Sequence, residues 1–454
     1  MCGGQPGALP QLNSDVPRLA VQMGLALGSD VALVSKFDRK QYYYADLPKG
    51  YQISQFDEPL LCGGSVDVPM ADGTLKKVGI TRAHLEEDAG KNMHDGDGSL
   101  AGSTGSRTDL NRAGVPLLEI VTEPDLRSGE EAAEYGAEIR RIVRALGVSN
   151  GNMQEGSLRC DVNVSVRAAG SAVLGTKVEV KNMNSFSAMR AAIDHETKRQ
   201  VALLESGRGD EIRQETRLWD EGSLTTRAMR AKEGLADYRY FPEPDLPPLV
   251  LTPDFIDACR DAMPELPRAR RERYAALGLP RDDATFLTED TDAGLYFDAV
   301  LAAGAPAKGA ANWVMGDVAG WCKSEGVAWA ELGERLSPGA LAELVSLIED
   351  DILSGKIGKQ LLPSLLDGAG KGGGGEVKAL AEREGLIQES DPEAVKAVVR
   401  EAMAANPKQL EQYRGGKTKL RGFFQGACMK ISGGTVNPKL LAQVLPAMLD
   451  GEEE

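Results

Sequence analysis

Alternation of apolar and polar residues dominates the first part of the chain. Between Leu158 and Arg167 an apolar side chain occupies every second position, and polar side chains lie between them. Successive side chains of a strand point to opposite faces, so this pattern predicts a half-buried antiparallel strand. The segment 176–181 alternates in the same way and leads into a helical pattern around 189–206. We therefore predict a sheet-rich first domain over residues 1–252, with one packed and one polar sheet face.

A run of prolines marks the end of this sheet-rich part. Four prolines fall between Phe241 and Pro248, and such a run cannot continue a helix or a central strand. From Pro253 onward the apolar residues repeat with a helical period. We place the C-terminal boundary of the first domain here and predict that the remainder of the chain is helical.

Helix start signals in the second half of the chain support this division. A side chain that can cap a helix stands directly before a proline at Ser337, Asp391 and Asn437. The predicted fold class is therefore α+β. An antiparallel-sheet cradle domain is followed by an all-α helical domain over 253–390 and by a small α-helical tail domain over 391–454.

Two strand-like segments of the first domain carry carboxylates in unusual places. In the first segment, strand geometry puts Glu86 on the face that also carries Arg82 and His84, and it puts Glu87 on the opposite face. In the second segment, Glu119 interrupts an otherwise apolar strand. A carboxylate buried in such a strand needs a cation, because an unpaired buried charge is costly.

Two kinds of cation fit these carboxylates. Mg²⁺ takes one or two carboxylates together with phosphate oxygens and water, so Glu86 and Glu119 on neighbouring strands would suit it. Arg82 or Arg112 would instead form structural ion pairs with them. The residue pattern leaves both interpretations open.

The composition excludes several classes of protein. Lys and Arg number 52 against 68 Asp and Glu, and the net charge of −16 excludes a basic protein that coats phosphates, although local basic patches remain compatible with it. No apolar stretch reaches the ~18 residues of a membrane helix, so we expect no membrane partner. The six cysteines are far apart and form no C-x-x-C pair, so we expect reduced thiols in an intracellular protein.

One segment near the end of the chain reverses the acidic trend. The segment 406–430 holds six basic residues and one acidic residue, with Tyr413, Phe423 and Phe424 interleaved. A basic segment with aromatic residues favours nucleic-acid binding, and a plain solvated helix face is the alternative. Its most closely spaced cations, which we expect to contact a nucleic-acid backbone, are Lys417, Lys419 and Arg421.

Several long strings in the sequence resemble one protein family. They are SKFDRK (35–40), DLPKGYQISQF (46–56), HLEEDAGK (84–91), NRAGVPLLEIV (111–121), EGSLRCD (155–161) and DYRYFPEPD (237–245). Together they closely resemble the B subunit of the tRNA-dependent aspartyl/glutamyl amidotransferases, the GatB/GatE family, and the resemblance runs along the whole chain.

The resemblance implies a ligase that works as a heterotrimer. It implies the conversion of Glu-tRNA(Gln) to Gln-tRNA(Gln), and often of Asp-tRNA(Asn) to Asn-tRNA(Asn), with glutamine as the amido donor. In this family the A subunit is a glutaminase that releases ammonia from glutamine, and the C subunit tethers the glutaminase to the B subunit. The B subunit uses ATP and Mg²⁺ to phosphorylate the side-chain carboxylate, because a carboxylate is a poor acyl donor, and it then receives the ammonia.

The resemblance also assigns individual residues. Glu86 and Glu119 match the metal-binding carboxylates of the family, and Lys49 and Glu87 match a pair assigned to its ammonia channel. The helical part and the basic segment resemble the family's tRNA-binding helical and tail domains.

The chain departs from the family pattern in three places. The family begins with a strand whose Glu-x-His pair completes the metal site, and this chain starts beyond it, which implies an N-terminally truncated member with an incomplete metal site. Cys2 matches the last cysteine of a zinc site in many members, which implies a zinc ion in the full-length protein. Ala45 replaces a usual proline.

A second hypothesis comes from a different functional class. A chain without the first metal-binding strand would serve as a non-catalytic tRNA-binding scaffold. A Glu-x-His pair encoded upstream would favour the enzyme, and its absence would favour the scaffold. The expected compartment is the mitochondrion or the chloroplast in a eukaryote and the cytoplasm in a bacterium.

Overall fold

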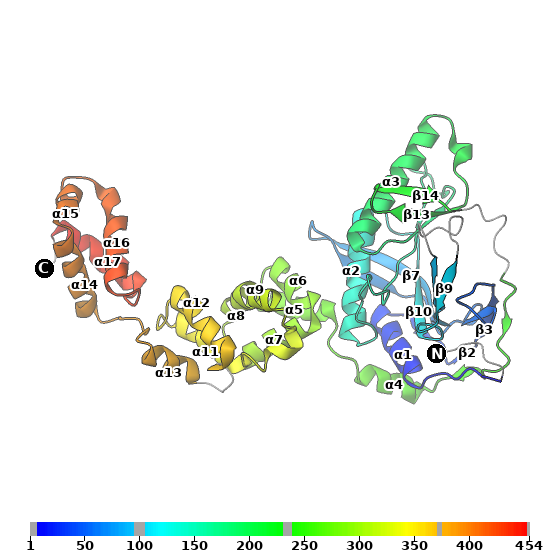
Figure 1. Cartoon of the computed structure of the whole chain (residues 1–454), viewed down its shortest axis with the longest axis horizontal. Helices are drawn as coiled ribbons and strands as arrows, with labels where there is room; N and C mark the ends of the chain where they lie inside the picture. The colour runs from blue at the N-terminus through cyan, green and yellow to red at the C-terminus, as the bar shows by residue number, and fades with distance from the viewer. Residues whose placement is uncertain (1–6, 95–104, 230–237, 370–374, 452–454) are drawn as a thin grey trace. The chain divides into compact units, whose positions relative to one another are not determined.

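The structure is a computed structural model that describes residues 7–94, 105–229, 238–369 and 375–451 (Figure 1). The chain divides into two compact units, Met1–Pro267 and Arg268–Glu454. The first unit is rich in antiparallel sheet, and the described part of the second is built from helices. The predicted α+β fold class is therefore confirmed.

The first unit extends beyond the predicted border at residue 252. Helix α4 (Pro253–Asp261) packs against helix α1 (Asp15–Leu27), and its residues Phe255, Ile256 and Cys259 belong to a core of the first unit. The division into domains at 252/253 and 390/391 stays a prediction.

The strands of the first unit follow one another in short segments around one long strand. They are β1 (Asp30–Val31), β2 (Val34–Ser35), β3 (Asp38–Gln41), β4 (Tyr51–Ser54), β5 (Leu61–Cys62), β6 (Ser65–Pro69), β7 (Leu75–Glu87), β8 (Lys91–His94), β9 (Ser106–Asp109), β10 (Pro116–Thr122), β11 (Val162–Val164), β12 (Val178–Lys181), β13 (Thr216–Asp220), β14 (Thr225–Ala228), β15 (Phe241–Pro242) and β16 (Leu249–Val250).

The long strand β7 organises the largest sheet. The strand order is β1-β5-β7-β10, β6 also pairs with β7, and all these pairings are antiparallel. Val78 and Ile80 of β7 are buried against side chains of α1 and of helix α2 (Gly129–Ala145), including Met23 and Ile139. The first half of β7 is therefore anchored in an apolar core, while its second half is free to carry polar side chains.

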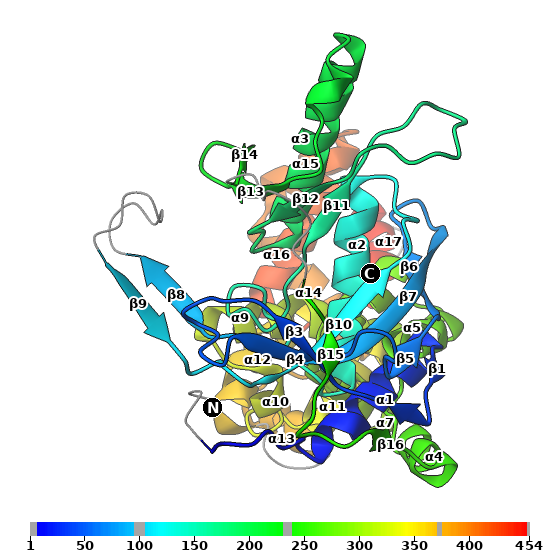
Figure 2. The same cartoon turned by 90° about the vertical axis from the view of Figure 1, so that its right-hand side faces the viewer.

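A three-stranded sheet lies beside that second half. Its order is β15-β3-β4, and β4 contacts β7 (Figure 2). Strand β15 reaches this sheet from far along the chain, because Phe241 pairs with Arg39. The sheet thus brings side chains of β3 and β4 against the polar end of β7.

A four-stranded sheet, β11-β12-β13-β14, holds the alternating segments that the sequence pattern singled out. Side chains alternate as predicted, but only Val162–Val164 has a partner strand, so β11 is shorter than the pattern indicates. If this pairing continued, Cys160 would face Asn182. The φ of Asn182 is 70°, a left-handed conformation, and it ends β12 and its pairing with β11. The pairing of β12 with β13 is parallel, whereas the other pairings between described strands are antiparallel.

Helix α3 (Phe186–Glu205) covers this sheet and packs on α2. The predicted helix around 189–206 is confirmed, and it begins three residues earlier because Ser185 caps it by accepting a hydrogen bond from the Ala188 amide. The contact with α2 is close: a Cβ at Gly136 would lie 2.6 Å from the Phe186 ring. A short 3₁₀ turn, Gly209–Glu211, follows α3.

Short helices make up the second unit. They are α5 (Pro267–Ala276), which begins at the unit border, α6 (Arg281–Glu289), α7 (Thr291–Ala302), α8 (Ala307–Trp313), α9 (Ala319–Glu325), α10 (Trp329–Leu332), α11 (Pro338–Glu349), α12 (Gly355–Ser364), α13 (Glu376–Arg383), α14 (Pro392–Ala405), α15 (Pro407–Arg414), α16 (Arg421–Ile431) and α17 (Pro438–Asp450), with π-helical turns at Val314–Val318 and Leu365–Ala369 and a 3₁₀ turn at Thr418–Leu420.

The predicted helix caps are confirmed at all three positions. The side chains of Ser337, Asp391 and Asn437 accept hydrogen bonds from backbone amides of the first turns of α11, α14 and α17, and each helix starts with proline. The described residues of this unit form two apolar cores. One runs from Tyr274 to Ala381, and the other from Val395 to Leu449.

Candidate active site

The second half of β7 brings a histidine and a carboxylate onto one buried face. His84 and Glu86 are 2% and 7% exposed, and the register of β10 places Glu119 opposite His84. His84 Nε2 lies 3.2 Å from Glu86 Oε1 and 3.9 Å from Glu119 Oε2. One side-chain ligand atom from each of the three residues lies within 4.8 Å of the others. Glu86 and Glu119 thus lie on neighbouring strands, as predicted.

Hydrogen bonds from β4 and a charge from β3 hold the Glu86 carboxylate. Ser54 Oγ donates to Oε1 at 2.6 Å, Gln52 Nε2 donates to Oε2 at 3.0 Å, and Lys40 Nζ lies 3.8 Å from Oε1. Burial raises the pKa of Glu86, but the hydrogen bonds from His84 and Ser54 and the charge of Lys40 outweigh it and hold the pKa below its ordinary value. Glu86 is therefore ionised at neutral pH.

Glu119 differs from the sequence prediction in one respect. Its side chain is 46% exposed, so the expectation that it is a buried charge is wrong. The reason is topological, since β10 is the edge strand of its sheet.

The alternative ion pairs of Glu86 and Glu119 with arginine are absent from the described residues. Arg112 pairs with Asp88 at 3.3 Å, and Arg82 forms no ion pair with either carboxylate. Strand β7 ends at Glu87, and the carboxylate of the next residue, Asp88, pairs with Arg112 and Arg159.

The donor set fits a divalent cation. Carboxylate oxygens are the ligands that Mg²⁺ prefers, and Glu119 is open to solvent while Glu86 is held in place. The Nδ1 atom of His84 is buried without a hydrogen-bond partner. Sequence reasoning did not name His84 as a ligand. The signal that could have identified it is its two-residue spacing from Glu86 on one strand face.

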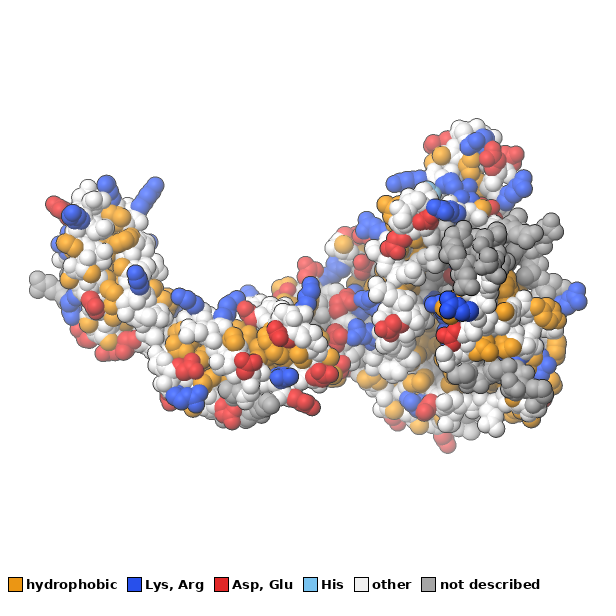
Figure 3. Space-filling model, in the orientation of Figure 1, with side chains coloured by type: hydrophobic (Ala, Val, Ile, Leu, Met, Phe, Trp, Pro, Cys, Tyr) orange, Lys and Arg blue, Asp and Glu red, His pale blue; other side chains and the backbone are white. Residues whose placement is uncertain are grey.

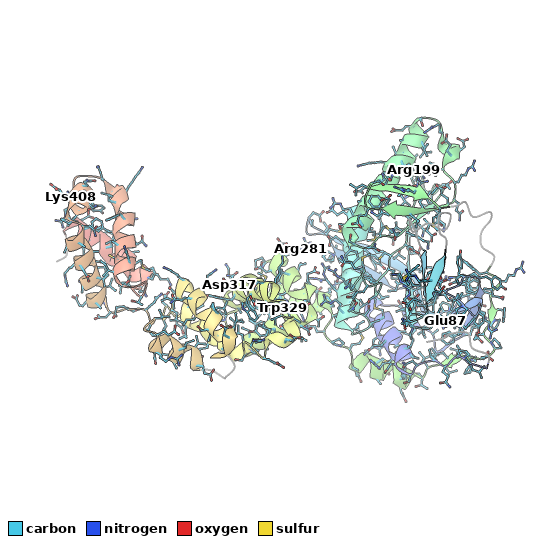
Figure 4. The ribbon with its side chains drawn as sticks, viewed as in Figure 1. Glu87, Arg199, Arg281, Asp317, Trp329 and Lys408 are labelled. Carbon is cyan, nitrogen blue, oxygen red and sulfur yellow. The ribbon has the colours of Figure 1, made fainter. Side chains whose placement is uncertain are left out.

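Lys49 and Glu87 form an ion pair on the other side of β7. Both side chains are largely buried, at 14% and 13% exposure. The Ile53 amide donates to Glu87 Oε1 at 2.9 Å, and Lys49 Nζ lies 4.7 Å from the centre of the Tyr51 ring. Figure 4 shows where Glu87 lies in the first unit. The predicted pairing of these two residues is confirmed as a contact, and its role stays a prediction.

Aromatic residues border the carboxylate cluster, and sequence reasoning did not assign them to the site. Phe56 and Tyr240 stack with their ring centres 4.2 Å apart. Burial, and then the nearby charge of Glu86, raise the pKa of Tyr42 and of Tyr240, so both phenols stay protonated and can donate hydrogen bonds. The string 237–245 contains Tyr240, but its distance along the chain conceals its proximity to Glu86.

The basic segment lies at the junction of α15 and α16, where Lys and Arg side chains project from the surface (Figure 3). Lys417, Lys419 and Arg421 are all exposed. Of the interleaved aromatic residues, Tyr413 and Phe424 are buried in the core, and only Phe423 is exposed. The aromatic pattern in this segment therefore reflects packing more than a stacking surface for bases.

The cysteines add no further site among the described residues. The structure shows free thiols at Cys62, Cys160, Cys259, Cys322 and Cys428. Cys2, the predicted zinc ligand, lies outside the described residues.

Comparisons with known proteins match both parts of the chain. A family model described as the GatB/GatE catalytic domain matches residues 1–257, and a second, described as a GatB domain, matches residues 295–449. The chain belongs to the GatB/GatE family. The catalytic-domain match of this family includes the whole carboxylate cluster and the Lys49–Glu87 pair.

Relatives of the GatB/GatE chain cover nearly all of its length. It is 56% identical over 454 residues to the chloroplastic/mitochondrial B subunit of the glutamyl-tRNA(Gln) amidotransferase of Physcomitrium patens, with 99% of this chain and 79% of that relative covered. It is 58% identical over 454 residues to the corresponding B-1 protein of Micromonas commoda, covering 99% and 82%. It is 56% identical over 455 residues to the B subunit of the aspartyl/glutamyl-tRNA(Asn/Gln) amidotransferase of Thermosynechococcus vestitus, covering 99% and 89%.

No helix in the described part of this GatB/GatE chain has both the length and the apolar character needed to cross a bilayer.

Proposed function

We propose that this chain is the B subunit of a tRNA-dependent amidotransferase, which converts Glu-tRNA(Gln) to Gln-tRNA(Gln) and Asp-tRNA(Asn) to Asn-tRNA(Asn). One observation carries the proposal. The Glu86 and Glu119 carboxylates lie on one face of β7 and β10, and the largely buried Lys49–Glu87 pair lies on the opposite face of β7, within the region that matches the GatB/GatE catalytic domain. The names of relatives at 53–58% identity support the same activity.

The proposed first step is the ATP-dependent activation of a tRNA-linked carboxylate. A carboxylate is a poor acyl donor, and a phosphoryl group supplies the leaving group that it lacks. Glu86 and Glu119 would hold Mg²⁺, which supplies positive charge against the phosphate oxygens when bound. His84, Lys40 and Ser54 hold the pKa of Glu86 below its ordinary value and so keep it ionised, and the hydrogen bonds from Ser54 and Gln52 orient its carboxylate.

The proposed second step uses ammonia that the glutaminase of the complex releases from glutamine. Lys49 and Glu87 would line the route by which the ammonia arrives, on the face of β7 opposite to Glu86. A buried ion pair offers both a donor and an acceptor to a small polar molecule. The tethering protein of the heterotrimer would hold the glutaminase against this chain.

The proposed tRNA contacts lie outside the catalytic domain. We assign the helical domain 253–390 and the tail domain 391–454 to tRNA binding, with the phosphate contacts made by Lys417, Lys419 and Arg421. The relatives are named for chloroplasts and mitochondria or come from cyanobacteria, and we propose an organelle for this chain in a eukaryote and the cytoplasm in a bacterium.

The decisive experiment is purification of the chain with its glutaminase and tethering partners, followed by ATP-dependent turnover of mischarged Glu-tRNA(Gln). We expect Gln-tRNA(Gln) to form only with ATP, Mg²⁺ and a nitrogen source. A complex that binds tRNA without forming amidated product would refute the enzymatic proposal and favour a scaffold role.

A further inference from the structure

Strand β4 touches both candidate sites at once. Gln52 and Ser54 point to Glu86, and the amide of the intervening Ile53 donates to Glu87. We propose that Gln52 is a positioning residue that couples the Glu86 carboxylate to the Lys49–Glu87 pair. The inference rests on the proposed function, and it adds a physical link between carboxylate activation and ammonia delivery.

Both polar atoms of the Gln52 side-chain amide form hydrogen bonds. Its Nε2 donates to Glu86 Oε2 at 3.0 Å and to the backbone carbonyl of Glu87 at 2.7 Å. Its Oε1 accepts a hydrogen bond from the Tyr42 hydroxyl at 3.1 Å. A primary amide has two N–H donors, and both acceptors of Nε2 can only accept, so the orientation of the side chain is fixed. Because Gln52 is 7% exposed, water offers little replacement for a lost bond.

The two acceptors belong to consecutive residues whose side chains serve different sites. Glu86 and Glu87 point to opposite faces of β7, so their two side chains do not contact each other. Gln52 instead joins the carboxylate of Glu86 to the peptide group that follows Glu87. A movement of the Glu86 carboxylate toward a cation therefore either breaks a buried hydrogen bond or carries the Glu87 backbone with it.

Ser54 provides an internal comparison. It donates to Glu86 Oε1 at 2.6 Å and forms no described bond to Glu87. Loss of Ser54 should therefore disturb the carboxylate alone, whereas loss of Gln52 should disturb the carboxylate and the ion pair together. Groups that hold a metal ligand by a hydrogen bond typically contribute ~10–100-fold to metal affinity.

Gln55 provides a matched control. It is also a buried amide, 1% exposed, and it also binds β7, because its Oε1 accepts from the Leu85 amide at 3.1 Å. Its Nε2 donates to Ser35 and not to either glutamate. Gln55→Met therefore removes a comparable buried amide next to the same strand without breaking the proposed link.

The test combines a metal measurement with a nitrogen-source measurement. Mn²⁺ binding to the full chain is measured by electron paramagnetic resonance, and amidation by the complete complex is measured with glutamine and with ammonium chloride. We expect Gln52→Met to weaken Mn²⁺ binding about tenfold and to lower the glutamine-to-ammonium rate ratio severalfold. We expect Ser54→Ala to weaken Mn²⁺ binding at an unchanged ratio, and Gln55→Met to change neither.

Any of three results from folded variants would overturn the inference. They are Mn²⁺ affinity and a rate ratio in Gln52→Met that match the parent chain, equal changes in Gln55→Met, and a changed ratio in Ser54→Ala. If Gln52→Met does not fold, Gln52→Asn takes its place in the test. Its shorter side chain cannot reach both acceptors, so we expect the same weakening of Mn²⁺ binding and the same fall in the rate ratio. Failure of both Gln52 variants to fold while Gln55→Met folds would also overturn it. If the proposed function fails, the parent complex forms no product, while the Mn²⁺ measurement still reports on Gln52.

Discussion

Arg39 and Glu243, which are 204 positions apart in the chain, form a two-point ion pair. Arg39 Nε lies 2.7 Å from Glu243 Oε2, and one terminal nitrogen lies 2.9 Å from Oε1. The Glu243 side chain is fully buried, and the guanidinium also lies 4.1 Å from the centre of the Tyr51 ring. This pair fastens the segment after β15 to β3 and β4, the strands that contact the candidate active site.

Removing the guanidinium should therefore destabilise the first unit. Arg39→Met leaves Glu243 as an uncompensated buried charge, and we expect a loss of about 3 kcal/mol in the free energy of unfolding, measured by urea titration. Arg39→Lys should recover only part of this loss, because an ammonium cannot form the fork or stack on Tyr51. A loss in Arg39→Met below ~0.5 kcal/mol, as for an exposed pair, would contradict this account.

The same pair predicts a dependence of stability on pH. Burial raises the pKa of Glu243, but the hydrogen bonds from Arg39 and from the Asp245 amide outweigh it and hold the pKa below its ordinary value of 4.5. The contribution of the pair is therefore present above pH 4.5 and is lost as the pH falls through the lower, folded-state pKa. Urea titrations at decreasing pH should show a steeper loss of stability in the parent chain than in Glu243→Gln.

Both candidate metal carboxylates should be required for amidation. Glu86→Gln and Glu119→Gln each remove a negative oxygen from the donor set, and we expect at least about a hundredfold loss of ATP-dependent amidation in the complete complex. Mn²⁺ binding should weaken in parallel. Glu123→Gln is the control. Glu123 directly follows β10, the strand that carries Glu119, and accepts a hydrogen bond from the Thr81 hydroxyl, so we expect near-normal amidation in this variant. Near-normal amidation in both test variants would refute the assignment.

Nitrogen supply should depend on the Lys49–Glu87 pair. Glu87→Leu leaves Lys49 unpaired and removes the acceptor of the Ile53 amide. Because the carboxylate cluster lies on the opposite face of β7, we expect glutamine-driven amidation to fall more than amidation driven by external ammonium chloride. Parallel rate measurements with the two nitrogen sources test this, and equal losses would indicate a damaged fold instead.

Salt dependence should reveal the role of the basic segment. Replacing Lys417, Lys419 and Arg421 with alanine removes three exposed cations, and the log–log slope of tRNA affinity against salt should flatten by about one to three units. Turnover at saturating tRNA should change little, because the proposed chemistry takes place in the first unit. Affinities measured at several salt concentrations provide the test.

A matched triple variant controls for the loss of charge in that experiment. Lys356, Lys359 and Lys378 are exposed cations in and around α12 and α13, and their replacement with alanine removes the same formal charge. A larger effect of this control than of the basic-segment variant would place the main phosphate contacts in the helical domain 253–390 and contradict their assignment to Lys417, Lys419 and Arg421.

Local signals in the sequence were sufficient for some features of the fold. The capping residues Ser337, Asp391 and Asn437 act within a few residues of their helices, so sequence reasoning located the helix starts accurately. The opposite orientations of Glu86 and Glu87 likewise follow from the two-residue period of a strand.

Features that depend on distant segments could not be predicted in this way. The exposure of Glu119 is set by the position of β10 at the edge of its sheet. The late start of β11 is set by the backbone of Asn182 on its partner strand, opposite Cys160. The contact of Gln52 with Glu86 depends on the packing of β4 on β7, and neither residue alone carries a signal for it.

The pairing of β7 also bears on how the site responds to its substrates. Arg82 and Ala83, which directly precede the carboxylate cluster, are paired with β5 on one side and with β10 on the other. Strand segments enclosed in this way open to solvent only when much of the surrounding structure opens, so their amide hydrogens should be among the slowest in the unit to exchange with deuterium. The backbone just before His84 and Glu86 is thus held on both sides, and we expect adaptation to an incoming tRNA end in the side chains and loops that follow it.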